Sequence, residues 1–357
     1  MAGDRHAVYP VLDLIFTLCG NRLNDRMFGI QSLGRICNWI VRTAVVSAVT
    51  FIVVSNFVFY PNMGFLGSLQ TILYLSSCLI IMFFWAKNRQ RLQKLVKSVS
   101  TRDSKSFART TTTISLICVI ILSLFNTSAT ITRLCLMPKI HWSDILLTIC
   151  SLIFDMNRYI VNDPIAYIIV LKTLTGRQKQ LLHDVEHKVS SRDPMVLLEE
   201  VKNICRMRHE FEALFSVVPL TLLAVLFLSL PNSVIILTAI SATTNELVRD
   251  LSFTAVFVNQ LLVVVLIIGS LVYQVCKSKR EMDSAASAVL FKVQSEYQAT
   301  KATVGVQTLM DSLREYRSLQ FTGCFLFTID QSLVLTFFSS VITFSVLLLQ
   351  LQNSTLV

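Results

Sequence analysis

The sequence predicts an all-α membrane protein with seven transmembrane helices, a cytoplasmic N-terminus, an extracellular C-terminus and long cytoplasmic helical extensions. Of the 357 residues, 53% are apolar and only 15% are charged. An ordinary soluble domain has about 25% charged residues, so this composition cannot supply a polar surface of the usual kind. It therefore argues against a soluble enzyme, a coiled coil and a disordered chain. Apolar segments long enough to cross the ~30 Å hydrocarbon core of a bilayer recur along the chain.

Seven such segments can be recognised. Each is predominantly apolar and reaches the roughly 20 residues that a transmembrane helix needs. Pro61, Asn62 and Met63 leave almost no loop between the first two segments, and Pro219 and Pro231 fall inside the fifth. The predicted spans are 41–60, 64–86, 111–132, 145–171, 213–241, 252–275 and 331–351.

Basic residues set the orientation of the chain. Of the 32 Lys and Arg residues, 28 lie in the N-terminal region, with Arg42 at its membrane edge, and in loops 87–110, 172–212 and 276–330. Cytoplasmic loops carry such an excess, so these segments are expected in the cytoplasm and the tail 352–357 outside. G-protein-coupled receptors have the opposite orientation. The net charge of +10 is therefore a topology signal and gives no reason to expect a nucleic-acid partner.

The long cytoplasmic segments are predicted to be helices and not flexible linkers. Apolar residues recur at steps of three and four, which places them on one helical face. Asp193 followed by Pro194 predicts a helix start, and the helix that follows is expected to run on into the fifth span. These faces could pack on one another, on neighbouring subunits, or flat on the bilayer surface. The faces are Leu181, Val185 and Val189; Leu197, Val201, Ile204 and Cys205; and Met282, Ala286, Val289, Val293 and Tyr297.

Polar groups inside the spans are candidates for function. Asp155 and Arg158 are three residues apart and share a helix face, as a ligand-binding or gating pair facing a wet cavity or as a structural ion pair. His183 and His187 are spaced as a metal pair could be, but no third ligand is apparent and a solvated face explains them. No catalytic motif, phosphate loop or metal cluster is recognised. We therefore expect no enzyme activity, cofactor or metal, and we expect the nine cysteines to be reduced thiols.

The last span ends in the sequence Thr343-Phe344-Ser345-Val346-Leu347-Leu348-Leu349-Gln350-Leu351. It resembles the C-terminal signature of insect gustatory receptors, which is Thr-Tyr, five mostly hydrophobic residues and Gln-Phe. Phe321-Thr322-Gly323-Cys324-Phe325, Ile329-Asp330 and Ser339-Ser340 are similar to the rest of that family's last block. The departures are Phe344 for Tyr, Leu351 for Phe and Ser345 within the hydrophobic stretch. Ser345 occupies a position where the sugar-receptor branch typically has Glu.

The resemblance implies a ligand-gated, non-selective cation channel that opens on binding a small-molecule, non-sugar tastant such as a bitter compound. It implies a homotetramer, or a heterotetramer with related receptor subunits, in the lipid bilayer of a sensory neuron's plasma membrane. An odorant-receptor-type channel subunit and a membrane transporter are the alternatives. The implied organisation is an N-terminal cytoplasmic segment (1–40), transmembrane helices 1 to 6 with the ligand pocket in their outer half (41–275), cytoplasmic anchor helices (276–330) and a pore-lining helix with a short tail (331–357).

Candidate site residues follow from this arrangement. Residues on one face of the last helix are predicted to line the pore and form its gate: Thr343, Phe344, Leu347, Gln350 and Leu351. Aromatic and polar residues in the outer half of the spans are candidates for the ligand pocket: Gln70, Tyr74, Phe125, Asn126, Trp142, Phe154, Asp155, Arg158, Phe227, Phe253, Phe257 and Asn259.

Overall fold

The computed structural model describes residues 65–99, 163–242, 247–297, 304–324 and 326–354, together with isolated positions between residues 16 and 145. The described chain is helical apart from one short antiparallel hairpin. Its elements are α3 (Phe65–Lys87), α4 (Arg89–Val99), α7 (Asp163–Lys188), α8 (Pro194–Phe215), α9 (Val217–Ala242), α10 (Leu247–Tyr297), α11 (Val304–Ser318), β1 (Thr322–Gly323), β2 (Phe327–Thr328) and α12 (Gln331–Ser354).

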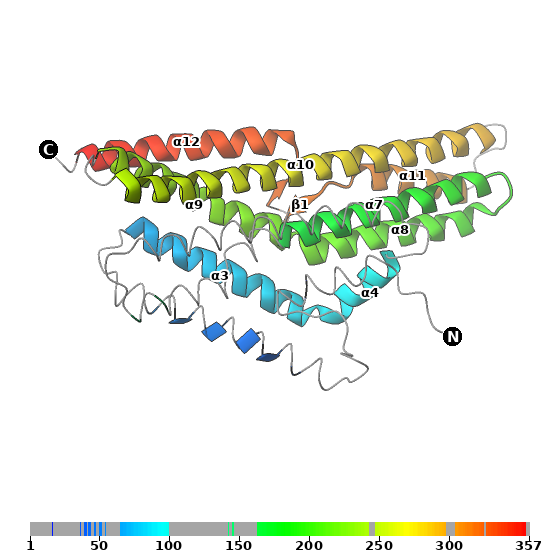
Figure 1. Ribbon diagram of the computed structural model, residues 1–357. Coiled ribbons are helices and arrows are strands. Elements are labelled where there is room, and N and C mark those ends of the chain that lie inside the picture. The colour runs from blue at the N-terminus through cyan, green and yellow to red at the C-terminus, as the bar shows by residue number, and fades with distance from the viewer. Residues whose placement is uncertain are drawn as a thin grey trace.

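Helix α10 runs along the length of the molecule and organises the rest. It has 51 residues, so at 1.5 Å per residue it is about 76 Å long, more than twice the hydrocarbon thickness of a bilayer. Helices α9 and α12 lie beside its N-terminal half, whereas α7, α8 and α11 lie beside its C-terminal half (Figure 1). We call α7, α8, α11 and the C-terminal half of α10 the distal bundle. The prediction that the sixth span continues as a helix beyond the membrane is confirmed.

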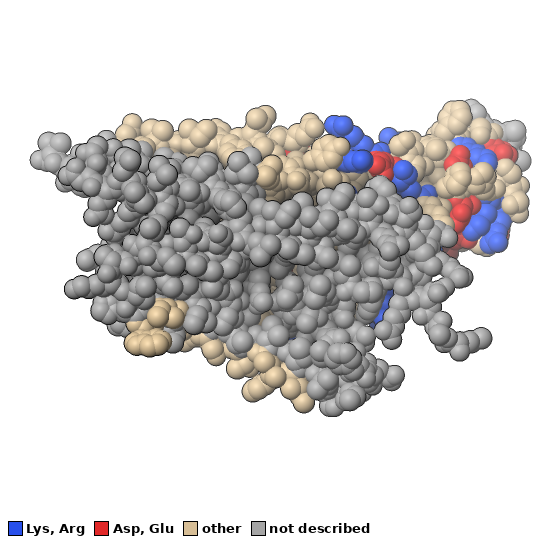
Figure 2. Space-filling model, in the orientation of Figure 1, with Lys and Arg blue, Asp and Glu red and all other residues tan. Residues whose placement is uncertain are grey.

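Charge and apolar surface divide between the two halves of the molecule. On the face shown in Figure 2, the charged side chains gather over the distal bundle, and the described surface of the other half carries few of them. Two stretches of the described residues are long and apolar enough to cross a membrane, Pro194–Phe227 and Gln331–Gln350. Helix α3 coincides with the predicted span 64–86, and α10 contains the predicted span 252–275. The spans 41–60 and 111–132, and most of 145–171, lie largely or wholly outside the described residues.

The predicted apolar faces of the distal bundle pack on one another. Met282, Ala286, Val289 and Val293 of α10 are fully buried, and Leu197 and Val201 of α8 and Val185 of α7 belong to the same core. Because these side chains are covered within one chain, they are not available to lie on a bilayer surface. Each fully buried side chain of this size contributes about 1.5–3 kcal/mol. The core of the distal bundle is continuous with the core formed by the other described helices.

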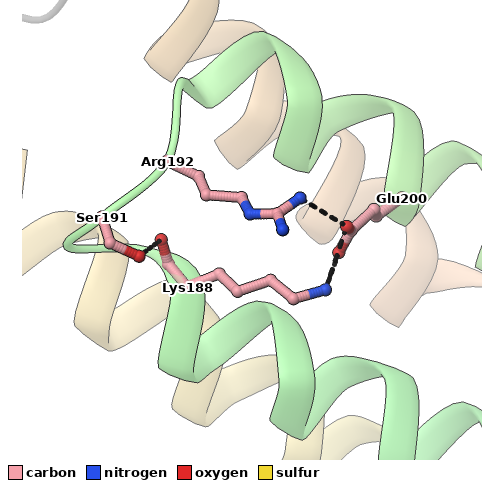
Figure 3. A network of polar contacts seen from close by, with 4 residues as sticks. All are labelled: Lys188, Ser191, Arg192 and Glu200. Carbon is pink, nitrogen blue, oxygen red and sulfur yellow. Dashed lines mark hydrogen bonds and ion pairs between the residues drawn. The ribbon is translucent and has the colours of Figure 1, made fainter.

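The turn between α7 and α8 forms as predicted and is closed by ion pairs. Asp193 caps α8, its side chain accepting a hydrogen bond from the Met195 N–H, and Pro194 is the first helical residue. Lys188 Nζ lies 3.0 and 3.1 Å from the two carboxylate oxygens of Glu200, and Arg192 lies 3.8 Å from the same carboxylate (Figure 3). Two cations from α7 and the turn thus converge on one α8 carboxylate.

The helix that begins at Pro194 runs on into the fifth span as expected, with one local interruption. Helix α8 ends at Phe215 and α9 begins at Val217, and residues Pro194–Phe227 form one apolar helical stretch of 34 residues. Pro219 has no N–H to donate to the carbonyl of Phe215, so the helical hydrogen-bond ladder is interrupted there. Ser216 keeps a helical backbone and its N–H donates to Glu212 O at 3.0 Å. The interruption is therefore local, and α9 follows α8 directly.

Aromatic side chains join α3 to the distal bundle. Trp85 is fully buried, and its indole N–H donates to the carbonyl of Leu214 at 2.9 Å. Its ring packs edge-on against Phe16 with centroids 4.8 Å apart, and it lies 5.6 Å from Phe215. The ring of Tyr167 in α7 also packs edge-on against Phe215, with centroids 6.2 Å apart. Because an indole N–H needs a partner when buried, this hydrogen bond fixes where α3 meets the end of α8.

Candidate functional site

Helix α12 has one packed face and one open face. Phe337, Val341 and Ser345 are buried and repeat at intervals of four residues, which places them on one side of the helix. This side meets α9. The opposite side is exposed along the described length of the helix. Between exposed apolar residues such as Leu335, Ile342 and Leu347, it carries small hydroxyl residues and one amide: Ser332, Thr336, Ser339, Ser340, Thr343 and Gln350. A single subunit therefore leaves a polar stripe uncovered on an otherwise apolar helix.

The hydroxyl groups of this stripe have a defined orientation. The hydroxyl of Ser340 donates to Thr336 O at 2.8 Å, and that of Thr343 donates to Ser339 O at 2.9 Å. Since each proton is used within the helix, the lone pairs of these oxygens remain outside it. Oxygen lone pairs are the groups that a partly hydrated cation can use in place of water. The exposed face of α12 is thus chemically suited to contact cations.

The structure divides the predicted pore and gate residues into two sets. Thr343, Leu347 and Gln350 are exposed on the same side of α12, and 51% of Leu347 is accessible. Phe344 instead packs on α9, with its ring stacked on that of Phe227 at 5.5 Å and an interplanar angle of 22°. Leu351 lies in α12, but its side chain is outside the described residues. The position that carries Tyr in the gustatory signature therefore contributes here to packing between α9 and α12.

The ligand-pocket candidates are only partly visible in the described chain. Phe227 is half-buried between α9 and α12, and Trp142 is 82% exposed. Some candidates lie in described helices, although their side chains are outside the described set: Gln70 and Tyr74 in α3, and Phe253, Phe257 and Asn259 in α10. The others lie outside the described residues altogether: Phe125, Asn126, Phe154, Asp155 and Arg158. Their pocket role stays a prediction.

A short hairpin connects the distal bundle to α12. Thr322 pairs with Thr328 and Gly323 with Phe327. Asp330 then caps α12, accepting hydrogen bonds from the Ser332 hydroxyl at 2.6 Å and from the Leu333 N–H at 3.0 Å. These two hydrogen bonds hold the pKa of Asp330 below its ordinary value. The cap keeps its charge at neutral pH, and the negative charge is favourable at a helix N-terminus.

Glycine is required in the hairpin by a close approach of an aromatic ring. A Cβ atom on Gly323 would lie 2.2 Å from the Phe327 ring, so the ring occupies the space of the missing side chain. The next residue, Cys324, has a left-handed backbone with φ of 49°. These features give a physical reason for the glycine in the motif 321–325, since the ring of the paired residue covers it.

Two buried charged residues of α8 hold this hairpin. Arg208 is 1% exposed and donates to the carbonyl of Leu319 at 2.5 Å. Its guanidinium also lies 4.4 Å from the ring centre of Phe321, which is within cation–π distance. One turn later, Glu212 is 7% exposed and accepts hydrogen bonds from the N–H and the hydroxyl of Thr322, both at 3.1 Å. The start of the hairpin is thus fixed to α8 by hydrogen bonds from one buried guanidinium and to one buried carboxyl group.

Sequence reasoning missed these two residues. The available signal was a pair of charges one turn apart, flanked by Phe211 and Phe215 on an apolar stretch close to the fifth span. Charged residues in such surroundings are almost never fully buried unless they are paired. Their partners, however, are a backbone carbonyl and a threonine more than 100 positions away along the chain. No local pattern identifies partners at that separation.

A second buried network joins three helices of the distal bundle. The Tyr316 hydroxyl of α11 donates to Gln178 Oε1 at 2.9 Å, and the Gln178 amide donates to the carbonyl of Ile204 at 3.0 Å. Burial raises the pKa of Tyr316 well above its usual value, so the phenol stays protonated and remains a donor. Gln178 is fully buried. The helix that precedes the hairpin is therefore tied to α7 and α8 through satisfied polar groups.

Comparison with known proteins agrees with this architecture. The family described as 7tm Chemosensory receptor matches residues 17–353. The solved structure of the insect olfactory receptor OR5 from Machilis hrabei superposes with a TM-score of 0.68 at 14% identity, covering 95% of this chain and 97% of that one. The same receptor in complex with eugenol gives a TM-score of 0.71 at 13% identity, with coverages of 96% and 97%. No curated protein matches.

The family match covers nearly the whole chain, and the fold likeness extends over the same length. The all-α, seven-helix fold expected from the sequence is thereby confirmed. This chain belongs to the 7tm chemosensory receptor family.

Proposed function

We propose that this chemosensory receptor is a subunit of a ligand-gated, non-selective cation channel, opened by a small-molecule tastant that is not a sugar. The observation that carries the proposal is the uncovered polar stripe of α12, lined by Thr336, Ser339, Thr343 and Gln350. A membrane-spanning helix that faced lipid with this side would leave polar side chains in hydrocarbon, which costs free energy. When several copies of the chain assemble around an axis, the stripes can face water together.

In this proposal four subunits, identical or related, place α12 around one pore in the plasma membrane of a sensory neuron. The N-terminus and the distal bundle lie in the cytoplasm, and the C-terminal tail lies outside. Leu347 and Leu351 lie one turn apart. When the four α12 helices move together and the pore narrows, these side chains close it by excluding water. The segregation of charge onto the distal bundle supports this orientation, because cytoplasmic segments carry most basic residues (Figure 2).

The ligand is proposed to bind among the outer halves of the spans, where the aromatic and polar candidates are expected. The olfactory receptor OR5 has been solved in complex with eugenol, which supports a small-molecule ligand for a receptor of this fold. The gustatory signature at the end of the chain favours a taste ligand over an odorant. A panel that contains bitter compounds, sugars and volatile odorants separates the gustatory from the odorant-type assignment.

Cysteine accessibility tests the pore. Ser339 is exposed on the polar stripe and Ser345 is 6% exposed on the packed side of the same helix, so Ser339→Cys and Ser345→Cys are a matched pair. With ligand present, a charged methanethiosulfonate reagent should block the current of Ser339→Cys and leave Ser345→Cys unchanged. Leu347→Ser should raise the current without ligand, since a polar gate dewets less readily. Equal sensitivity of the two cysteine variants would refute the proposed pore face.

A further inference from the structure

Helix α7 carries a histidine pair that the channel proposal does not use. His183 and His187 are exposed and lie one turn apart on the distal bundle. Their Nε2 atoms are 3.0 Å apart, and their rings meet edge-to-face with centroids separated by 4.3 Å. In the sequence alone no third metal ligand is apparent, which favours the interpretation that the two histidines lie on a solvated helix face. The structure adds that the Nε2 atoms of the two rings lie within hydrogen-bonding distance of each other.

Glu186 determines which nitrogen of His183 is free. Its Oε2 lies 3.4 Å from His183 Nδ1, so the carboxylate can accept the Nδ1 proton. A neutral His183 in that arrangement keeps its lone pair on Nε2, the atom that faces His187. Histidine ligands of metal ions commonly donate their other nitrogen to a carboxylate in this way, which fixes the ring and increases its basicity.

The separation of the two nitrogens fits shared coordination. Two nitrogens bound at about 2.0–2.1 Å to one ion lie about 2.9 Å apart at a right angle and about 3.3 Å apart at a tetrahedral angle. The observed 3.0 Å falls between these values. Imidazole suits Zn²⁺, Cu²⁺ and Ni²⁺, whereas Mg²⁺ and Ca²⁺ prefer oxygen ligands.

The surroundings hold the pair in place and do not repel a cation. The opposite side of α7 is fixed in the core by Leu182 and Val185, so the two histidines stay one turn apart without any further ordering of the backbone. The neighbouring cations are neutralised, because Lys179 lies 3.3 Å from Glu281 and Lys188 lies 3.0 Å from Glu200. The described residues contain no cluster of three or more His, Cys, Asp or Glu that could hold a metal ion. The remaining positions around an ion at this pair would therefore belong to water.

We propose that His183 and His187 form a two-histidine binding site for a divalent transition metal ion on α7, with Glu186 orienting His183. A bound ion links two successive turns of α7 shortly before the turn to α8 and makes this end of the distal bundle more rigid. The site requires neither ligand binding nor ion conduction, so it stands independently of the proposed channel.

Metal titration of the purified full-length protein tests the site. The protein is prepared with a non-histidine affinity tag and titrated with Zn²⁺ or Ni²⁺ by calorimetry at about pH 7.5, with Mg²⁺ as the control ion. We expect one Zn²⁺ or Ni²⁺ per chain, no binding of Mg²⁺, and weaker binding at about pH 5.5, because a protonated imidazole cannot ligate. Absence of Zn²⁺ and Ni²⁺ binding to the unmodified protein would overturn the proposal.

Substitutions assign the binding to this pair. His183→Ala and His187→Ala should each abolish the one-to-one isotherm, and His187→Cys should restore Zn²⁺ binding because a thiolate also ligates zinc. Glu186→Gln should weaken the affinity by about 10- to 100-fold, the effect usual for a group that orients a ligand. His209→Ala is the matched control, since His209 is also exposed but lies on α8. Unchanged binding in His183→Ala and His187→Ala would place the ion elsewhere and refute the assignment.

Discussion

Gly323→Ala is expected to strain the hairpin that leads into α12. A Cβ atom at this position would lie 2.2, 2.6 and 2.7 Å from three atoms of the Phe327 ring. Carbon atoms in favourable contact are about 3.5–4.0 Å apart, so the ring must retreat by roughly 1.3 Å or more. The antiparallel pairing of Gly323 with Phe327 fixes the ring over this position, which limits how far it can move without breaking the pairing.

The expected change in the free energy of unfolding of Gly323→Ala follows from two opposing effects. Forcing an extra methyl group into a filled space costs about 1–3 kcal/mol. Replacing glycine also lowers the conformational entropy of the unfolded chain, which stabilises the folded state by about 0.4–1 kcal/mol. The clash outweighs the restriction of the unfolded chain, and a net loss of about 1–2 kcal/mol in the free energy of unfolding is expected. For a domain of 150–250 residues, a loss of 1 kcal/mol lowers Tm by about 2–4 °C.

Thermal unfolding of the detergent-solubilised protein, followed by fluorescence-detected size exclusion, measures this change. The key comparison is a double-mutant cycle with Phe327→Ala, in which the ring that causes the clash is absent. In that background Gly323→Ala should cost little or be stabilising. Gly176→Ala is the matched control, because a Cβ there meets nothing within 4 Å and alanine is the better helix former, so its Tm should rise. An equal loss from Gly323→Ala in both backgrounds would refute the reasoning.

Three further predictions concern the connection between α8 and the hairpin. Arg208→Ala should cost about 2–5 kcal/mol, because it removes the hydrogen bond to Leu319 O and empties the space of a fully buried side chain. Arg206→Ala, at a 68% exposed side chain, should change Tm little, and equal losses would argue against the network. Cys324→Gly should stabilise the protein by about 1 kcal/mol, since a left-handed backbone costs a non-glycine residue about 1–2 kcal/mol, and an unchanged or lower Tm would contradict this. Burial raises the pKa of the Cys205 thiol from 9.0 to about 11, so at about pH 8 its thiolate is roughly 100-fold scarcer than that of an ordinary cysteine. Its alkylation by N-ethylmaleimide, measured by mass spectrometry, should be slow and should still be rising at about pH 9.5; a rate that levels off near pH 9 would show an ordinary thiol.

The helices of the distal bundle were predictable because their signals are local. Apolar residues at intervals of three and four lie on one face of any helix, and an Asp-Pro pair starts a helix whatever surrounds it. Val185, Val201 and Met282 were therefore identified as face residues before their partners were known, and all three are buried. The local interruption at Ser216 does not follow from the sequence pattern, because Pro219 can sit in the first turn of a helix as readily as it can bend one.

The candidate site was predictable only in part. Thr343, Leu347 and Gln350 fall on one face by spacing, and that face is open in the structure. Spacing could not show that Phe344 packs against Phe227, since a residue at the edge of a helical stripe turns to whichever neighbour tertiary packing supplies. The motif around Gly323 was visible as a resemblance, but its physical reason needs the position of the Phe327 ring.

The sequence by itself determined the class of this protein. Apolar runs of membrane-spanning length and the placement of basic residues follow from transfer free energies that act on each segment separately, so they indicate spans and orientation without a structure. Only the tertiary structure decided which partners the buried charged residues have and where side chains from distant segments converge. Arg208 and Glu212 meet partners more than 100 residues away, and Trp85 donates its indole N–H to the carbonyl of Leu214, 129 residues further along the chain. Such contacts depend on how separate elements pack, which no local pattern contains.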